Sequence, residues 1–201
     1  MPANHIERIN EAIATREFVR IGRRFEDTPI HGYVLAAGPR HFVMALVNDR
    51  VWYDGFECFR LKDIRSVAPD PYADFAKAAL RLRGQRKPRT PRLDLTSMQT
   101  LLASAGALFP LVTIHREKIQ PDVCHIGRVV ATSDKEVTLL EIDPGAVWEE
   151  ATETYSIKQI TRVNFGGGYE DALALVGGAA LDDGRGAGVG VGATRRRTAR
   201  K

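Results

Sequence analysis

The residues that come closest to a metal or nucleophile site are His115, Cys124 and His125, which lie near one another in the 201-residue sequence. Structural zinc needs about four thiolate or imidazole ligands, normally at paired short spacings. One adjacent Cys-His pair does not supply that pattern, so we interpret these residues as ordinary loop positions and predict no metal site. The second cysteine, Cys58, falls in an expected strand and is interpreted as a buried, inert thiol.

Acid–base chemistry and phosphate binding have no better support in the sequence. Carboxylates gather at 49–57 and 149–153, in expected turns and strand edges where water keeps them ionised and their charge blocks aggregation. Glycines gather at 166–168 and alternate along 184–192, but neither run leads into the Lys-Ser/Thr pair of a phosphate loop. The sequence also contains no Gly-x-Ser-x-Gly nucleophile elbow. We therefore predict no catalytic residue, no cofactor and no small-molecule substrate.

Two basic segments give the strongest functional signal. Residues 77–92 carry seven basic residues and residues 184–201 carry six, with no acidic residue in either. Removing these 13 from the 29 basic residues leaves 16 against all 25 acidic ones, so the rest of the chain is acidic. Lysine and arginine neutralise phosphates and release counterions, whereas the alternative is that both segments lie on the protein's own acidic surface or aid solubility. The residues predicted to contact nucleic acid are Arg81, Arg83, Arg86, Lys87, Arg89, Arg92, Arg195, Arg196, Arg197, Arg200 and Lys201.

Composition and hydropathy indicate a cytoplasmic globular protein. A hydrophobic fraction of 44% is enough to bury a core. No apolar run approaches the roughly 20 residues of a membrane span, and the N-terminal segment lacks the apolar stretch of a secretory signal. Two cysteines do not make a disulfide framework, which fits a reducing compartment.

The elements that position these residues are expected to occur twice. An apolar stripe at Ile6, Ile9 and Ile13 predicts a helix, with Asn4 as its N-cap and Glu7 completing a capping box. The stripe returns 89 residues later, and short alternating segments then follow in the same order at offsets that rise from 93 to 97 residues. Small increases between elements are typical of loop insertions, so the pattern indicates an internal duplication. The second stripe consists of Leu95, Met98 and Leu102.

Each repeat is expected to form five short strands and a short closing helix. Turn residues at Asn48-Asp49, Asp54-Gly55 and Asp143-Pro144-Gly145 separate the strands, and helices are expected at 72–82 and 171–176. We predict a mainly β fold with short flanking helices, in which two tandem five-stranded small barrels are related by duplication. The strands are expected at 18–22, 31–37, 41–48, 51–60 and 61–67, and at 111–116, 125–132, 135–142, 147–157 and 159–164. The expected core residues are Val19, Ile21, Val34, Met44, Leu46, Leu61 and Ile64, with Val112, Ile114, Val129, Leu139, Leu140, Ile157 and Ile160 in the second repeat.

A helix followed by five strongly bent strands, with Gly32-Tyr33-Val34 and Gly127-Arg128-Val129 opening the second strand, resembles the Sm-like family of small barrels. The resemblance covers residues 4–67 and 95–164 and implies that fold for each repeat. Sm-like RNA binders carry Asp and then Asn in the loop after the second strand, whereas only Asp134 is comparable here. The Arg-Gly pair of the family's second motif is missing from both repeats, so the family's RNA-binding residues are not carried over.

These observations divide the chain and leave three functional alternatives. We expect a helix and barrel at 1–83, a basic linker at 84–93, a second helix and barrel at 94–178, and a disordered Gly/Arg-rich tail at 179–201. The first alternative is a non-catalytic protein–protein interaction or scaffold module whose strand edges bind an unknown partner or a second copy. The second is nucleic-acid binding through the linker and tail, and the third is an enzyme with an unrecognised site. No membrane partner is expected.

Overall fold

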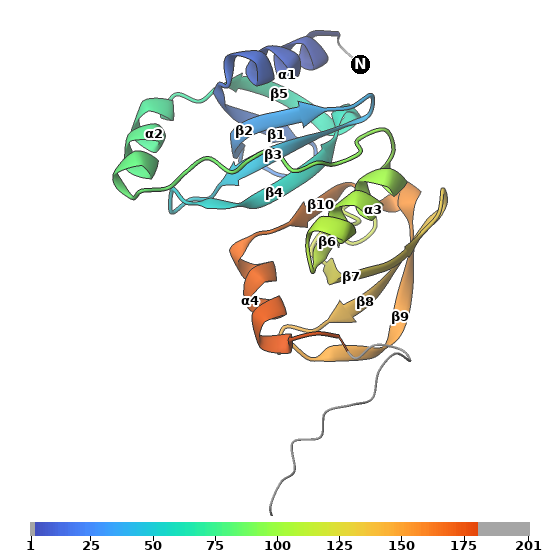
Figure 1. Ribbon diagram of the computed structural model, residues 1–201. Helices are drawn as coiled ribbons and strands as arrows, with labels where there is room; N and C mark the ends of the chain where they lie inside the picture. Colours follow the sequence, from blue (N-terminus) through green and yellow to red (C-terminus); the bar gives the residue numbers. More distant parts are fainter. Residues whose placement is uncertain (1–2, 181–201) are drawn as a thin grey trace, which may run out of the picture.

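The computed structural model describes residues 3–180, and the sequence predictions for Arg195, Arg196, Arg197, Arg200 and Lys201 lie outside the described residues (Figure 1). The described chain is mainly β, as predicted, with short flanking helices. Its first half contains α1 (Ala3–Thr15), β1 (Phe18–Arg23), β2 (Ile30–Ala37), β3 (His41–Val47), β4 (Tyr53–Arg60), the 3-10 turn η1 (Leu61–Asp63), β5 (Ile64–Pro69) and α2 (Ala73–Leu82). Its second half contains α3 (Met98–Leu108), β6 (Val112–His115), β7 (Cys124–Thr132), β8 (Glu136–Ile142), β9 (Trp148–Ser156), η2 (Ile157–Gln159), β10 (Arg162–Phe165) and α4 (Gly168–Gly177).

The strands form one continuous antiparallel sheet of ten strands, in the order β5-β1-β2-β3-β4-β10-β6-β7-β8-β9. This differs from the expectation of two separately closed barrels. The halves join where β4 pairs with β10, with Cys58 opposite Val163 and Phe56 opposite Phe165. Because β4 satisfies its outer backbone groups by pairing with β10, the sheet passes from one half into the other and does not close.

Two glycines allow neighbouring strands to approach closely while the sheet bends. A Cβ atom on Gly32 would lie 2.1 Å from the carbonyl oxygen of Ala45, and one on Gly127 would lie 2.4 Å from that of Leu140. In each strand the register shifts shortly after the glycine, between Val34 and Ala36 and, in the second half, between residues 129 and 131. A bulge of this kind increases the local twist, so each half curls around its own apolar side chains.

The largest apolar cluster joins both halves of the molecule. Val43 and Cys58 come from the first half and are fully buried with Leu101 and Leu102 of α3. The first half has its own smaller cluster, which α1 covers with Ile9. Of the expected core residues, Leu46, Val129 and Ile157 are half-buried and the others are buried.

The helices follow the expected stripes, but their first residues differ. The helix α1 already includes Asn4, so the prediction of Asn4 as N-cap is wrong. The helix α3 begins at Met98, after Leu95, because the Ser97 side chain accepts a hydrogen bond from the Thr100 backbone N–H in a capping box. Among residues 3–180, no helix combines the length and the apolar character needed to cross a membrane.

Buried ion pairs fix the two halves against each other. The Arg23 side chain is fully buried and donates to both carboxylate oxygens of Glu117, at 3.1 and 2.8 Å. Arg162 of β10 donates to Glu26 of the first half at 3.1 Å. These two ion pairs, the first buried and the second partly buried, cross the junction and resist any sliding of β4 along β10.

Candidate nucleic-acid interface

The basic linker begins at a cluster of aromatic side chains. The Arg83 guanidinium lies 5.0 Å from the Trp52 ring centroid and donates to the carbonyl oxygen of Val51 at 3.0 Å. The Lys87 ammonium lies 4.3 Å from the Tyr33 ring centroid, and burial together with Arg16 lowers the pKa of Lys87. Cation–π contacts of this length hold the two side chains at defined positions.

A groove of about 380 Å3 lies at the end of α2. Tyr33 and Tyr53 line it, with ring centroids 6.4 Å apart, beside Arg81 and Arg86. Burial raises the pKa of Tyr53 to about 12, so its phenol is neutral at physiological pH. Tyr33 is buried beneath Lys87, so the half-buried Tyr53 ring, bordered by cations, is the surface of this groove suited to stacking an unpaired base.

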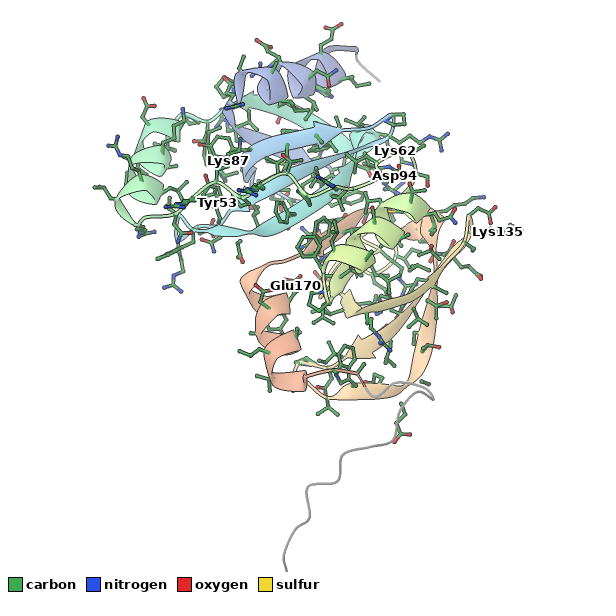
Figure 2. The ribbon with its side chains drawn as sticks, in the orientation of Figure 1. Tyr53, Lys62, Lys87, Asp94, Lys135 and Glu170 are labelled. Atoms are coloured by element: carbon green, nitrogen blue, oxygen red, sulfur yellow. The ribbon has the colours of Figure 1, made fainter. Side chains whose placement is uncertain are left out.

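The linker, with its cations, runs from this groove across the sheet to α3. Figure 2 shows Lys87 and Tyr53 at the α2 end of this path and Lys62 and Asp94 near the α3 end. The backbone at Leu95 packs against Gly38, where an added Cβ atom would lie 2.4 Å from the Leu95 carbonyl oxygen. Within residues 3–180, none of the six cations predicted between residues 81 and 92 forms an ion pair with a carboxylate. Arg81, Arg83, Arg86, Lys87, Arg89 and Arg92 are all exposed.

The linker ends at a larger pocket of about 700 Å3 between the two halves, which we call the junction pocket. Its walls come from the β2–β3 loop, the η1 turn, the start of α3 and the η2 turn. Three exposed cations, Arg40, Lys62 and Lys158, stand around it, with Asp134 as the acidic residue among its lining side chains. The apolar lining consists of Ile6, Pro39, Leu61, Met98, Ile157 and Ile160.

Two buried polar side chains of the junction pocket keep free hydrogen-bonding atoms. The Arg60 side chain is 8% exposed; it bonds to Asp63 and donates to the Ile160 carbonyl oxygen at 3.2 Å, but its Nη2 has no partner in the described chain. His41 is 5% exposed, and its Nδ1 also lacks a partner among residues 3–180. Burial, with Arg60, Arg40 and Lys62 nearby, lowers the pKa of His41 to about 4, so its ring is neutral near pH 7.

A buried donor without a partner is costly, and a ligand that accepts from it recovers that free energy. The first turn of α3 adds to this effect, because Met98 and Gln99 line the pocket and helix starts carry free N–H groups and partial positive charge. The junction pocket therefore suits a ligand that is anionic at one end and flat and apolar at the other.

Sequence reasoning found part of this surface and missed the rest. The linker cations were predicted, but the aromatic residues beside them, Tyr33, Trp52 and Tyr53, come from strands and a hairpin in the first half. The cationic residues of the junction pocket were also missed, since they come from loops that only the fold brings together. A signal was present in Arg40-His41 and Arg60-x-Lys62, two short basic pairs at the ends of expected strands.

A smaller cleft of about 240 Å3 tests the enzyme alternative. Burial raises the pKa of Glu57 to about 7, and this carboxyl accepts from Asn164 Nδ2 at 3.0 Å. Thr113 donates to Glu170 at 2.6 Å, while burial beside Arg162 lowers the pKa of His115 to about 3 and leaves it a weak base. In the described part of the chain, no group of His, Cys, Asp and Glu residues is arranged to hold a metal ion. Cys124 also lines this cleft, opposite His115 in the pairing of β6 with β7, but burial raises the pKa of its thiol, so it stays protonated beside a weak base.

Comparison of the chain with protein-family models, with curated proteins and with solved structures gave no match.

Proposed function

We propose that the protein binds single-stranded nucleic acid without catalysis, with the phosphate backbone along the linker and one nucleotide in the junction pocket. The observation that carries the proposal is the junction pocket itself, where Arg60 and His41 hold free polar atoms behind Arg40, Lys62 and Lys158. A phosphate would accept from Arg60 Nη2 and the exposed cations, and a base would lie against the apolar wall.

The groove at the end of α2 favours an unpaired strand over a duplex. Tyr53 is half-buried beside Arg81 and Arg86, and a base can stack on such a ring only when it is not already paired. A duplex would reach the exposed cations but would leave the ring and the pocket empty. The preference for a single strand is therefore a direct consequence of the proposal.

We also propose that the two halves are copies of one Sm-like unit. The strand order β5-β1-β2-β3-β4 corresponds to β10-β6-β7-β8-β9, position by position. The bending glycines Gly32 and Gly127 and the register shifts after them are 95 residues apart, and the turns η1 and η2 are 96 residues apart. These coincidences support a duplication, and they place the junction pocket between corresponding loops of the two units.

Binding is tested by fluorescence anisotropy with labelled oligouridylate, oligothymidylate and duplex DNA of equal length, each at two salt concentrations. We expect saturable binding of the single strands that weakens with salt, and weaker binding of the duplex. The variant R81Q/R86Q, which removes the groove cations, should bind less tightly, whereas R20Q/R24Q removes two exposed cations that line neither the groove nor the junction pocket. Equal losses in both variants, or no saturable binding at low salt, would refute the proposal.

The protein-interaction alternative remains a prediction with one structural observation in its favour. Among residues 3–180 the sheet ends in two edge strands, β5 and β9, each paired on one side, whose outer backbone groups can accept a further strand. Sedimentation velocity over a concentration series tests self-association of the chain through these edges. A sedimentation coefficient that does not change with concentration would exclude a second copy as the partner over that range.

A further inference from the structure

The strand β9 presents a long open edge to solvent. It is the last strand of the sheet, and in the described chain it pairs with β8. Residues 149–154 are exposed at every position, so both faces of the strand as well as its outer edge are accessible. Three of these residues, Glu149, Glu150 and Glu153, are acidic. Unpaired N–H and C=O groups along such an edge can bind another strand, and the charge decides which one.

The end of the described chain lies beside the beginning of this edge. Trp148, the first residue of β9, donates from its indole N–H to the Gly177 carbonyl oxygen at 3.1 Å. A Cβ atom on Gly177 would lie 2.6 Å from Ile142 and 2.9 Å from the Ala146 carbonyl oxygen, so α4 ends in contact with the β8–β9 hairpin. Figure 1 shows α4 ending at this hairpin. The residues that follow therefore start within a few residues of β9.

The sequence that follows alternates as a strand does, and its charge is positive, opposite to that of β9. Glycine alternates with Ala187, Val189, Val191 and Ala193, which is a period of two, as in a strand. The nine residues 186–194 would span about 30 Å when extended, which equals the nine residues of β9. From residue 184 onward the chain carries six basic residues and no acidic one.

We propose that residues 186–194 add to the open edge of β9 in the same chain as an eleventh strand. The basic residues at 195–201 then lie within reach of the β9 glutamates, Glu149 and Glu153 on one face and Glu150 on the other, where attraction acts over about 8–10 Å. The same three glutamates repel the β9 edge of a second copy, which carries identical charges. They also repel nucleic acid, so the tail arginines bind the protein's own edge. This assignment does not depend on the proposed function, which uses the linker and the junction pocket.

Hydrogen–deuterium exchange of the full chain, read on peptides covering 148–156, tests the proposal. The variant V189P/V191P removes two backbone donors from the tail without changing its charge, and V189T/V191T keeps both donors and a strand-forming side chain. We expect the β9 peptides to exchange about tenfold faster in the proline variant and as in the wild type in the threonine variant. Peptides covering β5, at the opposite end of the sheet, should not change in either variant.

Three other results would overturn the proposal. Equal exchange of β9 in the wild type and the proline variant would show that the tail does not pair with this edge. Protection that grows with protein concentration over a roughly hundredfold range would assign the edge to a second copy. An E149Q/E150Q/E153Q variant that exchanges like the wild type, with no effect of salt, would show that charge does not bring the tail to this edge and would contradict the proposal. Nucleic-acid binding by the proline variant, measured in parallel, keeps a failure here separate from a failure of the proposed function.

Discussion

Removing the exposed cations of the junction pocket should change how nucleic-acid affinity depends on salt. The pocket supplies three such cations, Arg40, Lys62 and Lys158, and the end of α2 with the linker supplies six, at positions 81–92. Each phosphate neutralised on a single strand contributes about 0.7 to the slope of log K against log salt, so full engagement predicts a slope near −6. The variant R40Q/K62Q/K158Q should reduce the slope to about −4 and weaken binding at least tenfold near 0.1 M salt.

The assay is a fluorescence anisotropy titration of labelled oligouridylate at four or more salt concentrations. The matched control, R20Q/R24Q/K118Q, removes the same charge from exposed positions that line neither the groove nor the junction pocket. Its slope should stay near the wild-type value, because distant charges release few counterions. A slope that is unchanged in R40Q/K62Q/K158Q, or reduced equally in both variants, would refute the assignment of the pocket as a phosphate site.

Three further predictions concern stability. E117Q removes the bidentate partner of the fully buried Arg23 and should lower the free energy of unfolding, measured by urea titration, by about 3 kcal/mol. The control E11Q, at an exposed ion pair, should have a smaller effect. An equal effect of the two substitutions would contradict the role of the Arg23–Glu117 pair in fixing the two halves. Burial raises the pKa of Glu57 from 4.5 to about 7, so the folded state holds this proton where the unfolded state has lost it, and stability should fall as pH rises from 4.5 to about 7. In the wild type this loss should amount to about 3 kcal/mol of unfolding free energy, and E57Q, which has no carboxyl to titrate, should not show it. Identical profiles of stability against pH for the wild type and E57Q would contradict the prediction. G32A and G127A should each lower the free energy of unfolding by at least about 2 kcal/mol in thermal unfolding, because the new Cβ atom meets a carbonyl oxygen. The control G84A places its Cβ atom in open space, so only its φ of 67° disfavours alanine and the loss should be smaller.

The strands could be predicted from local pattern because each is short, alternating and bounded by turn residues. The expected strand at 41–48 is observed as His41–Val47, and that at 125–132 as Cys124–Thr132. The pairing of β4 with β10 could not be predicted in the same way. It depends on Phe56 and Cys58 lying opposite Phe165 and Val163, more than 100 residues away in the chain, and no local pattern reports such a match.

The candidate site divides in the same way. A run of cations in a linker is visible in sequence, so Arg81, Arg86 and their neighbours were predicted. Whether a cation is paired depends on the surrounding fold. Arg60 is a candidate ligand-binding residue because it is buried and its Nη2 has no partner among residues 3–180. His41 is likewise an isolated histidine in the sequence, and only the fold places it beside Arg60 in one pocket.

The side chains around the two outer strand pairs explain why the sheet ends where it does. At the junction, the β3–β4 pair offers buried apolar side chains to the second half. Under the duplication, the corresponding positions on β8 and β9 carry three threonines, two of them exposed, and Leu140 is the remaining apolar residue. The β5 edge ends in Pro69, which has no N–H to donate, at the position that corresponds to Phe165. The junction positions are Val43, Ala45, Phe56 and Cys58, and their counterparts are Thr138, Leu140, Thr152 and Thr154.

Suppose that a further unit paired with this sheet in the way that β10 pairs with β4. At the β9 end it would bury hydroxyls at the positions where β4 buries Phe56 and Cys58. At the β5 end it would lack a backbone donor at Pro69. Burying a hydroxyl without a new partner costs about 1–3 kcal/mol, so several such positions outweigh the gain from strand pairing. A small-residue strand with alternating glycines avoids this cost, because it pairs with the backbone of β9 and leaves the threonine side chains in water. The polar edge of β9 thus disfavours continued assembly of the same kind and favours a short, cationic, glycine-rich strand.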